Sequence, residues 1–182
     1  MPNETYIAIL RGVNVGSTQV KMAVLQKIFE DAGYEKVQTY IQSGNVLFDT
    51  RRTDTLKLAR DVEALLRSEL KAEIPVLVLD TGALREIHES NPFIVGRNED
   101  IGKLHVTFLA EQPETSRLDK LERDKYLPDE FLPGEKAIYL FCPNGYGRTK
   151  LHNNFFESKL KVTATTRNWK TVTELLRLAA GR

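Results

Sequence analysis

The chain has 182 residues, of which 41% are hydrophobic and 28% are charged, as is typical of a globular protein with a proper core. Its formal net charge of +1 excludes strong attraction of the whole protein to nucleic acid or to an anionic membrane, so such binding would need a local patch. No apolar run approaches the roughly 20 residues that span a bilayer. Because no basic segment precedes the first apolar residues, we expect no signal peptide, no membrane contact and a cytoplasmic location.

The first half of the chain predicts the element order β-α-β-β-α-β, followed by one more helix. Apolar runs and alternating patterns indicate strands, and apolar residues at helical spacing indicate helices. Ser43-Gly44-Asn45 predicts the tight turn of a hairpin. The expected strands are residues 6–10, 37–41, 46–48 and 75–79, and the expected helices begin at 17 or 18, at 54 or 55, and at 83.

The second half repeats this order. Its expected strands are residues 104–109, the surroundings of Phe131, 137–142 and 162–165, and its expected helices are 116–125, 150–160 and 169–179. The polar segment 95–103 is the expected joint. We therefore predict an α+β fold with two ferredoxin-like (split βαβ) halves from a duplication, comprising residues 1–95 and 103–182.

Three motifs carry a resemblance to a known family. They are Ala8-Ile9-Leu10-Arg11-Gly12-Val13-Asn14-Val15-Gly16, Tyr40-Ile41-Gln42-Ser43-Gly44-Asn45 and Thr165-Thr166-Arg167-Asn168-Trp169-Lys170-Thr171-Val172. In these motifs, and in their order, the chain resembles the bacterial domain-of-unknown-function 1697 family (DUF1697), although Lys170 stands where members often have Asn. The resemblance implies a compact α+β fold. It brings no established activity, cofactor or catalytic residue.

The topology of the first half brings two polar loops together. The first and third strands of a split βαβ unit are antiparallel neighbours, so Arg11 and Asn14 should lie near Ser43 and Asn45. Arg11 could contact a carboxylate or phosphate with both arms of its guanidinium. The alternatives are that the nearby glycines only form turns and that Arg11 pairs with a local acid.

The second candidate stretch, residues 143–172, is rich in Arg, Asn and Thr and holds a single acid. Arg148 and Lys150 lie at the start of an expected helix, where free N–H groups can bind an anion. Arg167 and Asn168 lie before the last helix in the same way. The structural alternative is helix capping by Thr166 or Asn168.

Several chemistries are excluded by what the sequence lacks. The three histidines have no metal-ligand spacing, no G-x-S-x-G motif is present, and Cys142 lies in an apolar run that predicts a buried, inert thiol. No base, nucleophile, cofactor or metal site is assigned, so the sequence does not determine whether the protein is an enzyme.

The leading functional hypothesis is a site for an anionic small molecule bearing phosphate or carboxylate, in a cleft where the two halves meet. The eight candidate ligand-binding residues are Arg11, Asn14, Ser43, Asn45, Arg148, Lys150, Arg167 and Asn168. Two alternatives remain open: a nucleic-acid-binding module that uses the same cations on phosphates, and a purely structural role for the motifs.

Overall fold

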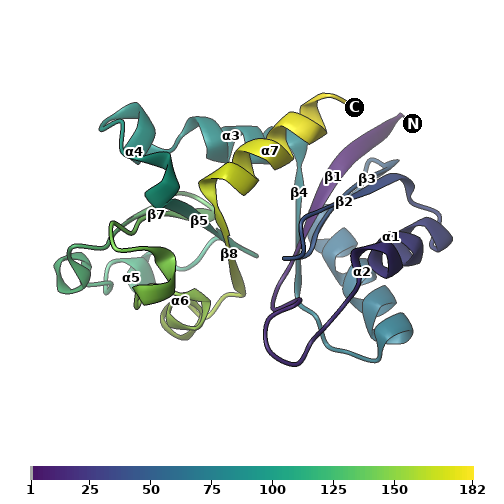
Figure 1. Cartoon of the computed structure of the whole chain (residues 1–182), viewed down its shortest axis with the longest axis horizontal. Coiled ribbons are helices and arrows are strands. Elements are labelled where there is room, and N and C mark those ends of the chain that lie inside the picture. The colour runs from purple at the N-terminus through teal and green to yellow at the C-terminus, as the bar shows by residue number, and fades with distance from the viewer. Residues whose placement is uncertain (1) are drawn as a thin grey trace. The chain divides into compact units, whose positions relative to one another are not determined.

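The computed structural model, which describes residues 2–182, contains two four-stranded antiparallel sheets, each with its own helices (Figure 1). The chain divides into two compact units, here called unit 1 (residues up to Leu84, with Leu175–Arg182) and unit 2 (Arg85–Glu174). Each sheet is built by a β-α-β-β-α-β segment. The predicted α+β class with two similar halves is therefore confirmed.

In the sheet of unit 1 the strand order is β2-β3-β1-β4, and all neighbouring strands are antiparallel. The bounds of its elements are β1 Asn3–Leu10, α1 Met22–Asp31, β2 Glu35–Tyr40, β3 Asn45–Arg51, α2 Thr55–Leu70 and β4 Val76–Asp80. This order places the first strand between the third and the fourth, so the ends of β1 and β2 and the starts of β3 and β4 share one edge of the sheet.

Helices α1 and α2 cover one face of this sheet and form the core of unit 1 with it (Figure 1). Phe29 of α1 packs edge-on against Phe48 of β3, with 5.3 Å between the ring centroids. Burying each such side chain stabilises the fold by about 1.5–3 kcal/mol. Ile7 and Ile9, which point to the opposite face, are also fully buried. Burial of both faces explains why β1 has a continuous apolar run and no alternating pattern.

The two helices of unit 1 differ in how well their starts could be predicted. Helix α2 begins where expected, because the Asp54 side chain accepts a hydrogen bond from the Lys57 N–H (2.8 Å). Helix α1 begins only at Met22, because the preceding residues form a small closed loop. In that loop Val15 and Thr18 form a β-bridge, and the Asn14 N–H donates to the Thr18 carbonyl (2.7 Å).

Unit 2 has the equivalent strand order, β6-β7-β5-β8, again entirely antiparallel. Its elements are α4 Pro92–Val95, β5 Leu104–Leu109, α5 Thr115–Leu118, β6 Glu130–Pro133, β7 Ala137–Phe141, α6 Asn153–Leu160 and β8 Ala164–Asn168, with short 3₁₀ helices at Ile101–Lys103, Arg123–Tyr126 and Tyr146–Arg148. Two helices, α3 (Thr81–Glu89) and α7 (Trp169–Ala180), contain the points at which the chain passes between the units.

Both faces of the second sheet are covered within unit 2. On one face Ile138 and Leu140 of β7 pack in a cluster with Phe156 and Leu160 of α6. On the other face the Tyr139 hydroxyl donates to the Ile87 carbonyl of α3 at 2.9 Å. Burial raises the pKa of Tyr139 to about 12, so this hydroxyl remains a donor at neutral pH.

Three predicted boundaries in unit 2 are wrong. The helix expected at 116–125 is interrupted after Leu118 and continues only as a 3₁₀ turn. Helix α6 begins at Asn153 and not at residue 150, because the ring of His152 accepts the Phe155 N–H (3.3 Å) and caps the helix there. Strand β8 runs from Ala164 to Asn168, later than the expected 162–165. Arg167 and Asn168 therefore belong to the strand.

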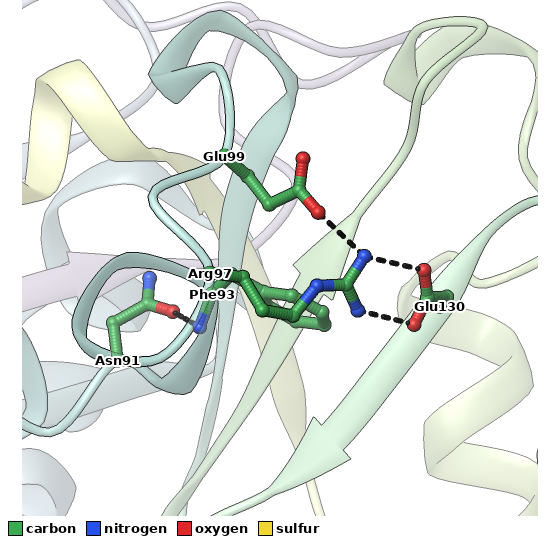
Figure 2. Close-up of polar contacts among 5 residues, drawn as sticks. All are labelled: Asn91, Phe93, Arg97, Glu99 and Glu130. Carbon is green, nitrogen blue, oxygen red and sulfur yellow. Dashed lines mark hydrogen bonds and ion pairs between the residues drawn. The ribbon is translucent and has the colours of Figure 1, made fainter.

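The polar segment 95–103, where the sequence predicts the joint between halves, lies within unit 2 and is held to β6 by the ion pairs of Arg97 (Figure 2). Arg97 donates to both carboxylate oxygens of Glu130 in β6 (2.7 and 3.0 Å) and to Glu99 (2.5 Å). Its guanidinium also lies 5.3 Å from the ring centroid of Phe93. The hydrogen bonds that Arg97 donates to the two carboxylates raise its pKa. A polar composition thus marks an ion-paired loop here, and the position of the joint stays a prediction.

The hairpin turn of unit 1 provides a test of its packing. Gly44 has φ +82°, and a Cβ at this position would lie 3.0 Å from the Leu10 Cβ and 3.2 Å from the Val13 Cβ. We expect Gly44→Ala to lower the free energy of unfolding by about 2–4 kcal/mol, because backbone strain adds to overpacking. Urea denaturation measures this change.

Gly33→Ala is the matched control, since Gly33 has φ +89° with nothing within 4 Å of the added Cβ. It should cost only the strain, about 1 kcal/mol. Equal losses in the two variants would contradict the packing described around Gly44.

Candidate functional site

The two polar loops of unit 1 lie side by side, as the topology predicted. The Leu10 N–H donates to the Gly44 carbonyl (2.9 Å), and the Asn14 side chain donates to the Gln42 carbonyl (2.7 Å). Arg11 is half-buried at the end of β1, and its backbone N–H donates to Pro75 (2.9 Å). The four candidate residues of unit 1 are therefore neighbours at one edge of the sheet.

The asparagines of these loops bond mainly to backbone groups. Asn14, with φ 57°, accepts the Val20 N–H (2.8 Å) and donates to the Val20 carbonyl (3.0 Å) as well as to Gln42. Asn45 is fully buried and donates to the Tyr40 carbonyl (2.9 Å) and the Ser43 hydroxyl (3.0 Å). These contacts fix the shape of the two loops. Asn14, Ser43 and Asn45 thus have the hydrogen bonds of turn residues.

In unit 2, Arg148 and Lys150 line a common pocket with a volume of about 290 Å³. The pocket lies between two segments of the chain that are adjacent in space, one preceding β6 and one following β7. Its lining residues are Lys125, Tyr126, Leu127, Pro128, Asp129, Asn144, Arg148 and Lys150. Three of these residues are cationic and only one is acidic, so the lining carries a formal excess of positive charge.

The cations of the pocket are exposed, and two of them have no ion pair. Among residues 2–182, neither Arg148 nor Lys150 makes a salt bridge. The Lys125 ammonium lies 3.4 Å from a carboxylate oxygen of Glu122, and both side chains are exposed. Such a surface pair contributes little stability and exchanges readily for another anion.

The walls of the pocket are held by ring packing and turn hydrogen bonds. Tyr126 packs edge-on against Phe155, with 5.0 Å between centroids, and this anchors the 3₁₀ turn that carries Lys125. Gly145, with φ 89°, allows the sharp turn after β7, and its carbonyl accepts the Arg148 N–H (3.1 Å). These contacts hold the two segments that carry the cations in fixed positions on either side of the pocket.

Cys142, at the end of β7, is the inert thiol that the sequence predicted. It is fully buried, and burial together with the nearby Asp129 carboxylate raises its pKa to about 11. A thiol with such a pKa is almost entirely protonated at neutral pH and is a poor nucleophile. Cys142 is therefore not a candidate nucleophile for the pocket.

Arg167 and Asn168, the other two candidates of unit 2, do not line this pocket. Arg167 is only 7% exposed and donates to the Thr165 hydroxyl and the Thr166 carbonyl, both at 2.9 Å. Burial lowers its pKa to about 10, while Tyr146 acts in the opposite direction, so the guanidinium stays charged at neutral pH. Asn168 accepts the Thr171 N–H (2.8 Å) and caps α7, as the structural alternative predicted.

Six residues of the pocket were missed by the sequence reasoning, namely Lys125, Tyr126, Leu127, Pro128, Asp129 and Asn144. The first of them was assigned to the end of a regular helix. The Tyr-Leu-Pro-Asp sequence that follows contains a turn signal that could have ended that helix earlier.

The nearest candidates for proton transfer, His152 and Glu157, both bond to the backbone. His152 caps α6, and the Glu157 carboxylate accepts the Ala164 N–H (3.0 Å). Residues 2–182 contain no group of three or more His, Cys, Asp or Glu side chains arranged to hold a metal ion. Within the same range, no helix has both the length and the apolar character required to cross a membrane.

Two histidines stack on aromatic rings in unit 2. The ring of His88 lies 4.6 Å from that of Trp169, and its Nε2 is 3.0 Å from the Thr173 hydroxyl. The ring of His105 lies 4.6 Å from that of Tyr146. Burial lowers the pKa of both histidines, so both are neutral in the folded protein at neutral pH.

The fold defines a protein with two four-stranded α+β halves, and a structure of the same kind is known. A conserved bacterial protein from Streptococcus pneumoniae aligns over 98% of this chain and 99% of its own length, with a TM-score of 0.77 and 23% sequence identity. No curated protein matches the sequence. Residues 3–139 match the family described as "Protein of unknown function (DUF1697)", and the chain belongs to this family.

The cap of α7 can be tested by substitution. We expect Asn168→Ala to lower the free energy of unfolding by about 1 kcal/mol, because the Thr171 N–H then loses its acceptor. Asn168→Asp restores an acceptor at the same position and should retain most of the stability. Chemical denaturation distinguishes the two variants, and equal destabilisation by both would contradict the capping role.

The two partly buried histidines predict a loss of stability in acid. Their pKa values are lowered on folding, so the unfolded chain binds more protons, and stability falls as the pH drops below the ordinary histidine value of about 6.5. The double variant His88→Phe, His105→Phe keeps a ring for each stack but cannot titrate. Its melting temperature should fall less than that of the wild type between pH 7.5 and 5.5. An identical fall would contradict the prediction, because all carboxylates are common to both proteins.

Proposed function

We propose that this protein binds an anionic small molecule, bearing phosphate or carboxylate, in the pocket of unit 2 that contains Arg148 and Lys150. The observation that carries the proposal is the gathering of three cations around one pocket, two of them without an ion pair among residues 2–182. Surface cations placed together repel one another, and an anion between them removes this repulsion.

The side chains of the pocket suit an anion in geometry as well as in charge. The guanidinium of Arg148 can donate two parallel hydrogen bonds to a carboxylate or phosphate, and Lys125 and Lys150 act as point charges. Asn144 and Tyr126 add neutral donors. Because all three cations are exposed, binding does not first require a buried charge to be uncovered.

Of the eight residues that the sequence singled out, this proposal uses only Arg148 and Lys150. The hypothesis of a single cleft between the halves, which would also include Arg11 and Arg167, stays a prediction. Asn14, Ser43, Asn45 and Asn168 have hydrogen bonds that account for them as turn and capping residues.

Isothermal titration calorimetry with phenyl phosphate and with benzoate tests the proposal. We expect Arg148→Ala and Lys150→Ala each to weaken binding at least about fivefold, the effect of one charge at about 4 Å in water, without lowering the melting temperature. Lys159→Ala is the matched control, since it removes an exposed cation of α6 that does not line the pocket. The proposal fails if neither compound binds, or if the control variant weakens binding equally.

The same calorimetry, repeated with a generic single-stranded oligonucleotide at several salt concentrations, tests the nucleic-acid alternative. Binding of a generic single-stranded oligonucleotide with a steep dependence on salt, and without binding of either small anion, would favour a phosphate-backbone interface.

A further inference from the structure

Resting on the proposed function, we infer that the ligand of this pocket is a phosphate monoester in its dianionic form, with an organic group that has apolar or aromatic surface. Three features of the pocket lead to this class: the arrangement of its cations, the single acid among them, and the apolar residues beside them.

The cations approach the pocket from two different segments of the chain. Lys125 comes from the 3₁₀ turn before β6, whereas Arg148 and Lys150 come from the loop after β7. A group with three terminal oxygens can contact both segments at once, with two oxygens toward Arg148 and the third toward Lys125. A carboxylate held by both arms of the guanidinium keeps both of its oxygens in the plane of that pair, whereas a phosphate directs a third oxygen out of this plane toward a second cation. The two-sided arrangement therefore favours phosphate.

The charge of the lining favours a dianion. Lys125, Arg148 and Lys150 carry three positive charges and Asp129 carries one negative charge, which leaves a formal charge of +2 on the lining. Glu122, which pairs with Lys125, is exposed and lies outside the lining, so an anion can replace it. In a positive lining each additional negative charge on the ligand tightens binding. In water at about 4 Å this gain is about fivefold per charge.

The organic part of the ligand follows from the apolar side of the pocket. Leu127 is 59% exposed, Pro128 is exposed beside it, and the ring of Tyr126 completes this wall. A large aliphatic side chain left in water beside a group of cations provides a surface for an apolar or aromatic substituent. Inorganic phosphate would use the cations and leave this wall uncovered. A monoester covers both.

Calorimetry on the full chain tests the inference with three probes that share one ring: phenyl phosphate, methyl phenyl phosphate and benzoate. At pH 7.5 phenyl phosphate is largely a dianion and the other two are monoanions, so we expect phenyl phosphate to bind at least about fivefold more tightly than either. Its advantage over the diester should shrink steadily as the pH falls below about 6, because the second phosphate pKa is about 6. Inorganic phosphate should bind more weakly than phenyl phosphate.

Asp129→Asn supplies a second, independent readout. Removing the single negative charge of the lining should tighten the binding of phenyl phosphate several-fold more than that of benzoate, because a dianion is repelled more strongly. Unchanged or weaker binding of phenyl phosphate by a folded Asp129→Asn variant overturns the inference. Equal binding of all three probes also overturns it, while leaving the proposed anion site intact. Absence of binding by every probe would instead overturn the proposed function itself.

Discussion

The antiparallel pairing of the first strand of each half with its third and fourth strands is the constraint on which the rest of this structure depends. In unit 2, Leu104 lies opposite Phe141 and His105 lies opposite Asn168, so the ends of β7 and β8 meet at the start of β5. In unit 1 the same order places the loop after Leu10 beside the hairpin at Gly44. Because the register of a buried sheet cannot slip without turning its core residues outward, these loop positions are fixed.

The candidate cations of unit 2 are of two kinds, buried and exposed, and the cost of removing a charge from water explains why they differ in their contacts. Arg167 lies under the surface and is held by the Thr165 hydroxyl and the Thr166 carbonyl, since a buried charge requires hydrogen-bond partners. Arg148 and Lys150 lie at the surface, where water supports an unpaired cation at little cost. The residues with the strongest internal contacts thus have the clearest structural role. Those with the fewest contacts are the best candidates for an external ligand.

The same division explains what the three motifs that carry the resemblance do in this chain. Asn14 ties together two loops, Asn45 closes the hairpin, and Asn168 begins the last helix, each through a hydrogen bond to the backbone. Asn suits such positions because its short side chain can form hydrogen bonds to nearby backbone groups and so hold a turn. The cationic pocket lies entirely outside these motifs, in the segment before β6 and the loop after β7.

The sequence by itself determined the class of fold, because apolar periodicity and turn residues are local signals. It predicted the start of α2 from the capping residue Asp54, and it predicted the burial of Cys142 from the apolar run around it. Tertiary structure alone decided the burial of Arg167. It also decided that Lys125 and Arg148 line one pocket, although they are 23 residues apart in the sequence. Such proximity follows from strand pairing and side-chain packing, which no local pattern of residues encodes.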